Sequence, residues 1–118
     1  MKDFAPLSRD FTVLMACRNY MVLLEGRPVM PLSVEIGACV QDVETVNGTD
    51  WRCPVRFTLG HEVTVHLGVG IDSFQALRIA MDRVRWQLER LAQECGYSFS
   101  YLEMPVDFSP DAWQKNLL

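Results

Sequence analysis

Three polar residues on neighbouring predicted strands form the only constellation in this sequence that could do acid–base chemistry. Glu35, Arg56 and His66 are each flanked by apolar residues in alternation, which places them on the outer face of a half-buried sheet. A carboxylate, a guanidinium and an imidazole in one row could bind an anion or transfer a proton. The competing interpretation is a solvated cross-strand ion pair beside a surface histidine, because exposed rows of this kind are common on open sheets.

No metal or cofactor site is predicted. His61 and His66 are five residues apart in a strand pattern, so they point to opposite faces of the sheet. The cysteines lack a Cys-x-x-Cys pair or a neighbouring histidine, which favours free buried thiols; they are Cys17, Cys39, Cys53 and Cys95. Phosphate-loop, dinucleotide, nucleophile-elbow and metalloprotease motifs are also missing. We therefore expect a protein without a cofactor that is not an enzyme.

Alternation of apolar and polar side chains predicts four strands, followed by one helix. The expected strands span 19–25, 29–41, 51–59 and 62–69, with a loop at 41–50. In the fourth strand the inward residues should be Val63, Val65, Leu67 and Val69, which leaves Glu62, Thr64 and His66 outside.

The row of polar residues depends on how these strands pair. Pairing Leu59 with Val63, and Ala38 with Cys53, keeps every apolar residue inward. This register aligns the outer side chains of the three strands.

The helix is predicted to begin after Asp72, an N-cap residue with Gln75 completing a capping box, and to end at Gly96. Its apolar stripe should lie on the sheet and consists of Phe74, Leu77, Met81, Val84, Leu88, Leu91 and Cys95. A short strand should follow Tyr97, and Ser109-Pro110-Asp111 is typical of a second helix start. The first 18 residues fit either a short helix from Ser8 or an extra strand.

The predicted fold class is α+β, an antiparallel meander of about four strands packed on one long helix in the C-terminal half, with short terminal elements. Residues 1–118 form a single domain, in which 19–96 make the core and 1–18 and 97–118 are extensions.

Two apolar residues lie on the helix side opposite the predicted core stripe. Ile79 and Trp86 are seven residues apart, where a solvent-exposed helix face would carry polar side chains. Either a partner covers them, or a terminal segment does, through one or more of Phe4, Leu7, Phe11, Phe108 and Trp113. Arg83 and Arg90 lie nearby, and arginine with tryptophan is the composition of a binding hot spot, although helix arginines are also commonly solvated ion pairs.

Charge and composition exclude several function classes. The net charge of −4 argues against general nucleic-acid binding. A loop with Asp42, Glu44 and Asp50, and a tail with Glu103 and Asp107, could instead dock a basic protein, or could simply be solvated. The longest apolar run is too short to span a membrane, and charged residues interrupt any signal peptide, so a cytoplasmic location without membrane contact is expected.

Two motifs resemble a small bacterial domain family of unknown function. The residues are Trp51-Arg52-Cys53-Pro54 and the segment from Val69-Gly70-Ile71-Asp72-Ser73 through Phe74-Gln75-Ala76-Leu77. That family has a Trp-x-Cys-Pro strand and a Gly-x-Asp-Ser-x-Gln-Ala-Leu helix start. The similarity covers residues 26–96 and implies a fold, but it implies no activity.

These features predict a non-enzymatic protein-binding domain, most concretely a bacterial immunity-type protein that neutralises a toxin, such as a nuclease, by occlusion. A homo-oligomeric interaction module, such as a homodimer with a self-complementary helix face, is the main alternative. A small-molecule binder that uses Glu35, Arg56 and His66 is a third.

Overall fold

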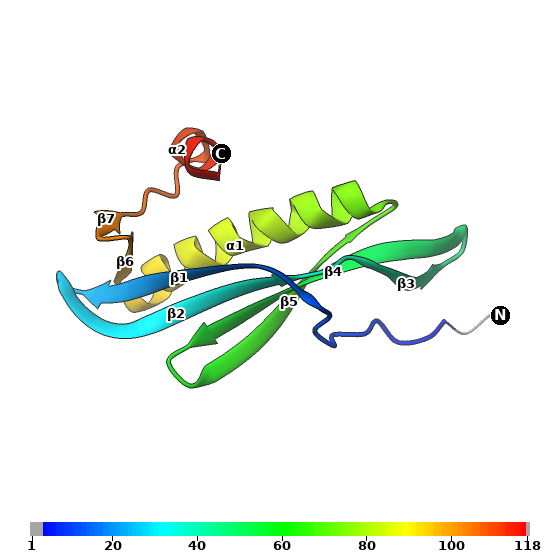
Figure 1. Cartoon of the computed structure of the whole chain (residues 1–118), viewed down its shortest axis with the longest axis horizontal. Helices are drawn as coiled ribbons and strands as arrows, with labels where there is room; N and C mark the ends of the chain where they lie inside the picture. The colour runs from blue at the N-terminus through cyan, green and yellow to red at the C-terminus, as the bar shows by residue number, and fades with distance from the viewer. Residues whose placement is uncertain (1–3, 118) are drawn as a thin grey trace.

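The structure, a computed structural model that describes residues 4–117, combines one antiparallel sheet with one long helix (Figure 1). The predicted α+β class is confirmed, but within the described residues the sheet has seven strands rather than about four. The strands are β1 (Leu14–Leu24), β2 (Arg27–Gly37), β3 (Val40–Thr45), β4 (Gly48–Leu59), β5 (Glu62–Gly70), β6 (Tyr97–Tyr101) and β7 (Met104–Pro105). The helices are α1 (Ser73–Cys95) and α2 (Pro110–Leu117).

The additional strands come from segments that were expected to be loops or extensions. Residues 41–50 were predicted to be a loop, but β3 and β4 form a hairpin there that turns through Val46 and Asn47 and pairs Thr45 with Gly48. β1 begins at Leu14 rather than at residue 19, and residues 4–12 form neither the helix from Ser8 nor a strand. The predicted strand after Tyr97 and the helix after Ser109 are both present.

The β4–β5 hairpin has a register one residue away from the predicted one. Leu59 pairs with Glu62 rather than with Val63, because the turn contains only Gly60 and His61. Gly60 has φ 60°, the left-handed conformation that the first position of a tight II′ turn requires. Because side chains alternate, this slip of one residue exchanges the two faces of β5.

The residues that β5 turns toward α1 are therefore small or polar. Gly68 and Gly70 share a face with the core residues Cys53 and Trp51, while the four branched residues expected to face inward lie on the opposite side. A Cβ atom on Gly68 would collide with the backbone of Ala76 and Ala80 in α1. The helix and strand backbones thus approach more closely than any larger residue would permit.

This close approach determines which stripe of α1 is buried. The buried residues are Ala76, Ala80, Val84 and Leu88, at a spacing of four, with Leu91 partly buried. Phe74 and Leu77, predicted to belong to the core stripe, are 83% and 40% exposed. The helix ends are as predicted: Asp72 accepts a hydrogen bond from the Gln75 backbone N–H at 2.7 Å, and Gly96 caps the C-terminus with φ 73°.

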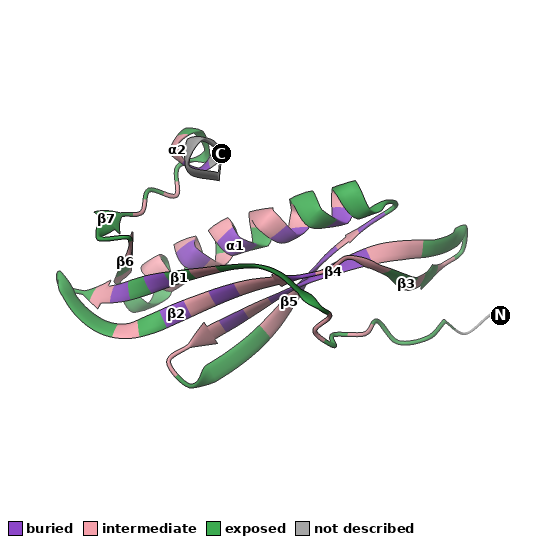
Figure 2. Ribbon diagram, viewed as in Figure 1, coloured by how far each residue is buried: buried purple, intermediate pink, exposed green. Residues whose placement is uncertain are grey.

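Each face of the sheet is partly covered. The two helices lie on one side of it, and the N-terminal segment crosses the other (Figure 1). Burial is concentrated where α1 meets the central strands (Figure 2). On the face of the sheet that the N-terminal segment crosses, the buried Arg52 donates hydrogen bonds to both Asp42 carboxylate oxygens at 2.8 and 3.1 Å. It donates another to the Asp10 carbonyl at 2.7 Å. This charge-assisted network holds residues 4–12 against the sheet.

We expect Gly68→Ala to lower the free energy of unfolding by about 1–3 kcal/mol, the usual cost of overpacking, because the added methyl group meets helix backbone that cannot rotate away. Chemical denaturation monitored by circular dichroism would measure the change. Thr64→Ala, an exposed position on the same strand, is the matched control and should cost less than about 1 kcal/mol. Equal stability of Gly68→Ala and the unmodified protein would contradict the close approach.

Candidate functional site

The predicted row of Glu35, Arg56 and His66 on the outer face of the sheet, the outer-sheet row, is only partly assembled in the structure. Glu35 and Arg56 are paired across β2 and β4, in the register predicted for these strands, and Arg56 donates two hydrogen bonds to the carboxylate at 2.9 and 3.1 Å. These bonds lower the pKa of Glu35. The Arg56 guanidinium also stacks on the Phe11 ring, 4.0 Å from its centroid. The pair is therefore neutralised and partly covered by the N-terminal segment.

His66 does not belong to this row, because the β4–β5 register places it on the opposite face of the sheet. It pairs with the buried Val55, and its ring meets the edge of Phe57 at a centroid distance of 5.3 Å. Burial is the main cause of its lowered pKa, followed by the charges of Arg83, Arg90 and Arg9. A proton relay from Glu35 through Arg56 to His66 is therefore not available.

The flank of α1 that faces away from β1 carries the predicted partner-binding residues. Ile79, Arg83, Trp86 and Arg90 follow one another at spacings of four, three and four, which is one side of a helix. Trp86 remains 48% exposed, and the Arg83 guanidinium lies 5.6 Å from its ring centroid. Ile79 is half-buried, and Arg90 forms an exposed ion pair with Glu94 at 3.2 Å.

Three of the terminal residues that could have covered Trp86 pack elsewhere. Phe11 lies on the far side of the sheet, against Arg56. Phe108 packs on Phe99 with their ring centroids 5.7 Å apart. Trp113 is buried on the opposite flank of α1, beside Val84. The Trp86 side chain is thus available on the surface.

The acidic residues proposed to face a basic partner do not form one surface. Asp42, Glu44 and Asp50 lie at the β3–β4 end of a molecule 54 Å long, whereas Glu103 and Asp107 lie near β7 at the other end (Figure 1). Several of them also have structural roles. Asp42 is bound by Arg52, Glu44 accepts a hydrogen bond from the Ala5 N–H at 2.9 Å, and Asp107 accepts one from the Ser109 N–H at 2.8 Å. The acidic loop and tail therefore offer few unpaired carboxylates.

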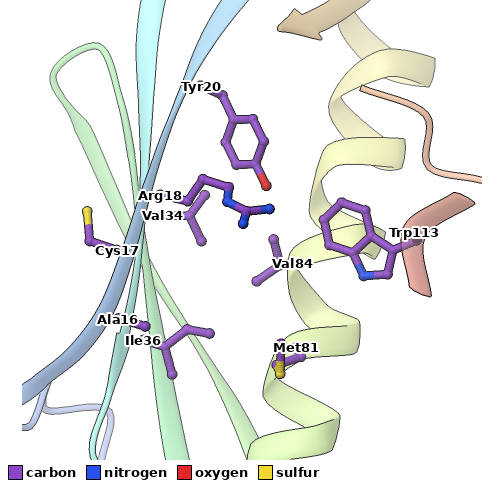
Figure 3. Close-up of a pocket in the computed structure, with 9 residues that line it drawn as sticks. All are labelled: Ala16, Cys17, Arg18, Tyr20, Val34, Ile36, Met81, Val84 and Trp113. Atoms are coloured by element: carbon purple, nitrogen blue, oxygen red, sulfur yellow. The ribbon is translucent and has the colours of Figure 1, made fainter. Parts of the chain in front are cut away.

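A cleft between β1 and α1 was not anticipated from the sequence. Its volume is about 170 Å³, and it is lined mainly by apolar residues of β1, β2 and α1 together with Arg18, Tyr20 and Trp113 (Figure 3). The signal in the sequence was the alternation of Ala16, Arg18 and Tyr20. This alternation does not by itself predict a face turned toward α1, because the charged Arg18 stands at an inward position.

The cysteines and potential metal ligands show no assembled site within residues 4–117. In this range, no three His, Cys, Asp or Glu side chains gather around a point that could hold a metal ion. All four cysteines are free thiols, but only Cys53 is buried, while Cys17 and Cys95 are exposed, contrary to the expectation of buried thiols. Burial and the neighbouring Cys39 raise the pKa of the Cys53 thiol to about 12. That thiol is therefore kept protonated.

Within the described part of the chain, neither helix is both long and apolar enough to cross a lipid bilayer.

The fold defines an α+β domain in which one helix covers part of an antiparallel sheet. The chain belongs to the family described as a domain of unknown function, DUF6968, whose family model matches residues 17–108. The match begins in β1 and ends before α2, so it includes both motifs on which the resemblance was based. No curated protein and no solved structure is detectably similar to this chain.

The lowered pKa of His66 predicts that the domain is less stable in mild acid. The unfolded chain binds a proton at His66 more readily than the folded one, so the free energy of unfolding should fall as pH drops below about 6.5, the ordinary histidine pKa. His66→Gln should reduce this fall, as measured by urea denaturation at a series of pH values. His61→Gln, in the exposed turn of the same hairpin, is the control and should preserve it.

Proposed function

We propose that this domain acts by binding another protein in the bacterial cytoplasm, as an immunity-type inhibitor that occludes a cognate toxin such as a nuclease. The observation that carries the proposal is Trp86, which remains half exposed on α1 between two arginines. Tryptophan is enriched at protein interfaces, because its large apolar ring carries a polar N–H that can reach a partner.

The physical properties of this flank suit a protein interface. Trp86 offers a large apolar area with few rotatable bonds, and Arg83 and Arg90 add planar donors on either side of it. Tryptophan and arginine are the residue types most enriched among interface hot spots. Because the helix backbone is already ordered, little backbone conformational entropy would be lost on binding.

The charges on this flank indicate which charge the partner's surface should carry. The charges of Arg83 and Arg90 contribute to the lowered pKa of His66 in β5, although burial is the larger cause. Arg90 is paired with Glu94, whereas Arg83 forms no ion pair among the described residues, so Arg83 is the cation of this flank that suits an acidic group on the partner. Docking of the helix flank is better supported than phosphate mimicry by the acidic loop and tail, because those acidic residues lie at two ends of the molecule and are partly paired.

The proposal requires no reaction at the domain itself. The outer-sheet row, the only catalytic constellation in the sequence, consists of a neutralised Glu35–Arg56 pair with His66 on the other face. Inhibition would follow from blocking the toxin's own site.

Trp86→Ala should weaken the complex by on the order of 30-fold, which corresponds to about 2 kcal/mol, the threshold for a hot-spot residue. The partner would first be captured by the tagged protein from a lysate of its own cells and identified by mass spectrometry. Its affinity would then be measured by calorimetry, and its toxicity by expression with and without this domain. Phe74→Ala is the matched control, because it removes an even more exposed aromatic ring from the first turn of the same helix.

Three results would contradict the proposal. Unfolding of Trp86→Ala would place the side chain in the core, and an unchanged affinity would place the interface elsewhere. Light scattering that shows a dimer abolished by Trp86→Ala would favour the homo-oligomeric alternative.

A further inference from the structure

One edge of β1 lacks a neighbouring strand over most of its length. β2 pairs with one edge from Leu14 to Leu24, whereas β6 pairs with the other edge only from Met21 to Leu24. β6 ends at Tyr101, where the chain turns back through two residues of positive φ. Within residues 4–117, no strand pairs with the edge that runs from Leu14 to Tyr20.

This edge is only partly protected as an open strand. β1 contains neither lysine nor proline, and its protective features are the inward-pointing Arg18 and an irregularity in the pairing with β2 between Leu14 and Ala16. Apolar side chains are exposed where the strand begins, with Val13, Leu14 and Met15 exposed by 74%, 50% and 68%. Alternate residues of the strand turn their backbone N–H and C=O groups toward this open edge. The edge is therefore competent to accept an additional strand.

The cleft described above lies directly beside this edge. Arg18 and Tyr20 extend from β1 toward α1, where Met81 and Val84 form the facing wall, and Trp113 closes the far side (Figure 3). Side chains of an added strand would alternate between the two sheet faces, so every second one would reach this apolar cleft.

The polar groups of the cleft are donors that lack an anionic partner. Arg18 forms no ion pair with any carboxylate of the described residues, and its guanidinium lies 4.4 Å from the Tyr101 ring centroid. The indole N–H of Trp113, a residue only 5% exposed, has no hydrogen-bond acceptor there. No Asp or Glu lines this cleft or the adjoining one between β1 and β7. A carboxylate that enters the cleft would pair with the Arg18 guanidinium.

From these observations we infer that β1 binds an extended segment of a partner protein, which adds as a strand to the Leu14–Tyr20 edge and places a carboxylate against Arg18. A neighbouring apolar side chain on the same face of the segment enters the cleft beside Met81. A second copy of this chain fits less well, since β1 contains no Asp or Glu and could not supply the carboxylate. The inference deepens the proposed function, because it specifies how a partner chain docks, and it uses the flank of α1 opposite Trp86.

The test is selection of random 12-residue peptides displayed on phage against the immobilised full-length chain. We expect the selected peptides to carry Asp or Glu two residues from a large apolar residue, the spacing that puts both on one face of a strand. The selected peptide, made synthetically, should slow hydrogen exchange of the Leu14–Tyr20 amides. Arg18→Gln should weaken its binding at least tenfold, whereas Arg18→Lys should retain most of the affinity. Arg27→Gln, an exposed arginine at the start of β2, is the matched control and should not change the affinity.

Several outcomes would overturn the inference. They are the absence of any selected peptide, selected peptides without an acidic preference, and exchange protection outside β1. Protection of β1 that rises with protein concentration alone would assign the edge to a second copy. If Arg18→Gln fails to fold, loss of binding by the folded Arg18→Lys variant would count equally against it. None of these results involves Trp86, so a negative peptide experiment would not contradict the proposed interface on the helix flank. Conversely, if no partner is captured or Trp86→Ala has no effect, the result of the peptide experiment is unaffected.

Discussion

The contact between β5 and α1 is the constraint on which the rest of the structure depends. Gly68 has no side chain, so the backbones of Ala76 and Ala80 lie against the strand at a separation that a single methyl group would prevent. Helices usually rest on sheets through layers of large side chains, whereas at this one contact glycine faces alanine. The contact therefore fixes both the position of α1 over the sheet and its rotation about its own axis.

The position of α1 leaves two different surfaces on its flanks. The helix packs mainly on β4 and β5, and the cleft beside Arg18 remains open between α1 and β1, partly closed by Trp113. On the other flank, the rotation that buries the alanines turns Trp86 outward beside Arg83. Both proposed binding surfaces are thus consequences of one packing contact, yet they are physically separate and differ in chemistry.

The charged residues on the outer face of the sheet are paired within the domain, so this face stabilises the fold. Arg52 is bound by Asp42 and the Asp10 carbonyl, and Arg56 is bound by Glu35 and stacked on Phe11. Each arginine is satisfied within the domain, and each also touches the N-terminal segment. These contacts hold that segment across the sheet, whereas Arg18 in the cleft has no comparable anionic partner.

The sequence alone determined the local features of the fold. Asp72 and Gly96 defined the ends of α1, and the alternation of β2 and β4 gave the correct Glu35–Arg56 pair, because capping and strand periodicity act over a few residues. It did not determine the face of β5, since a two-residue turn and a three-residue turn suit the same residues around Gly60 and differ by one register step. It determined only part of the buried stripe of α1: Val84 and Leu88 are buried as predicted, but Ala76 and Ala80 are buried in place of Phe74 and Leu77. Tertiary packing selected the two alanines, since Gly68 on the facing strand leaves no room for larger side chains there.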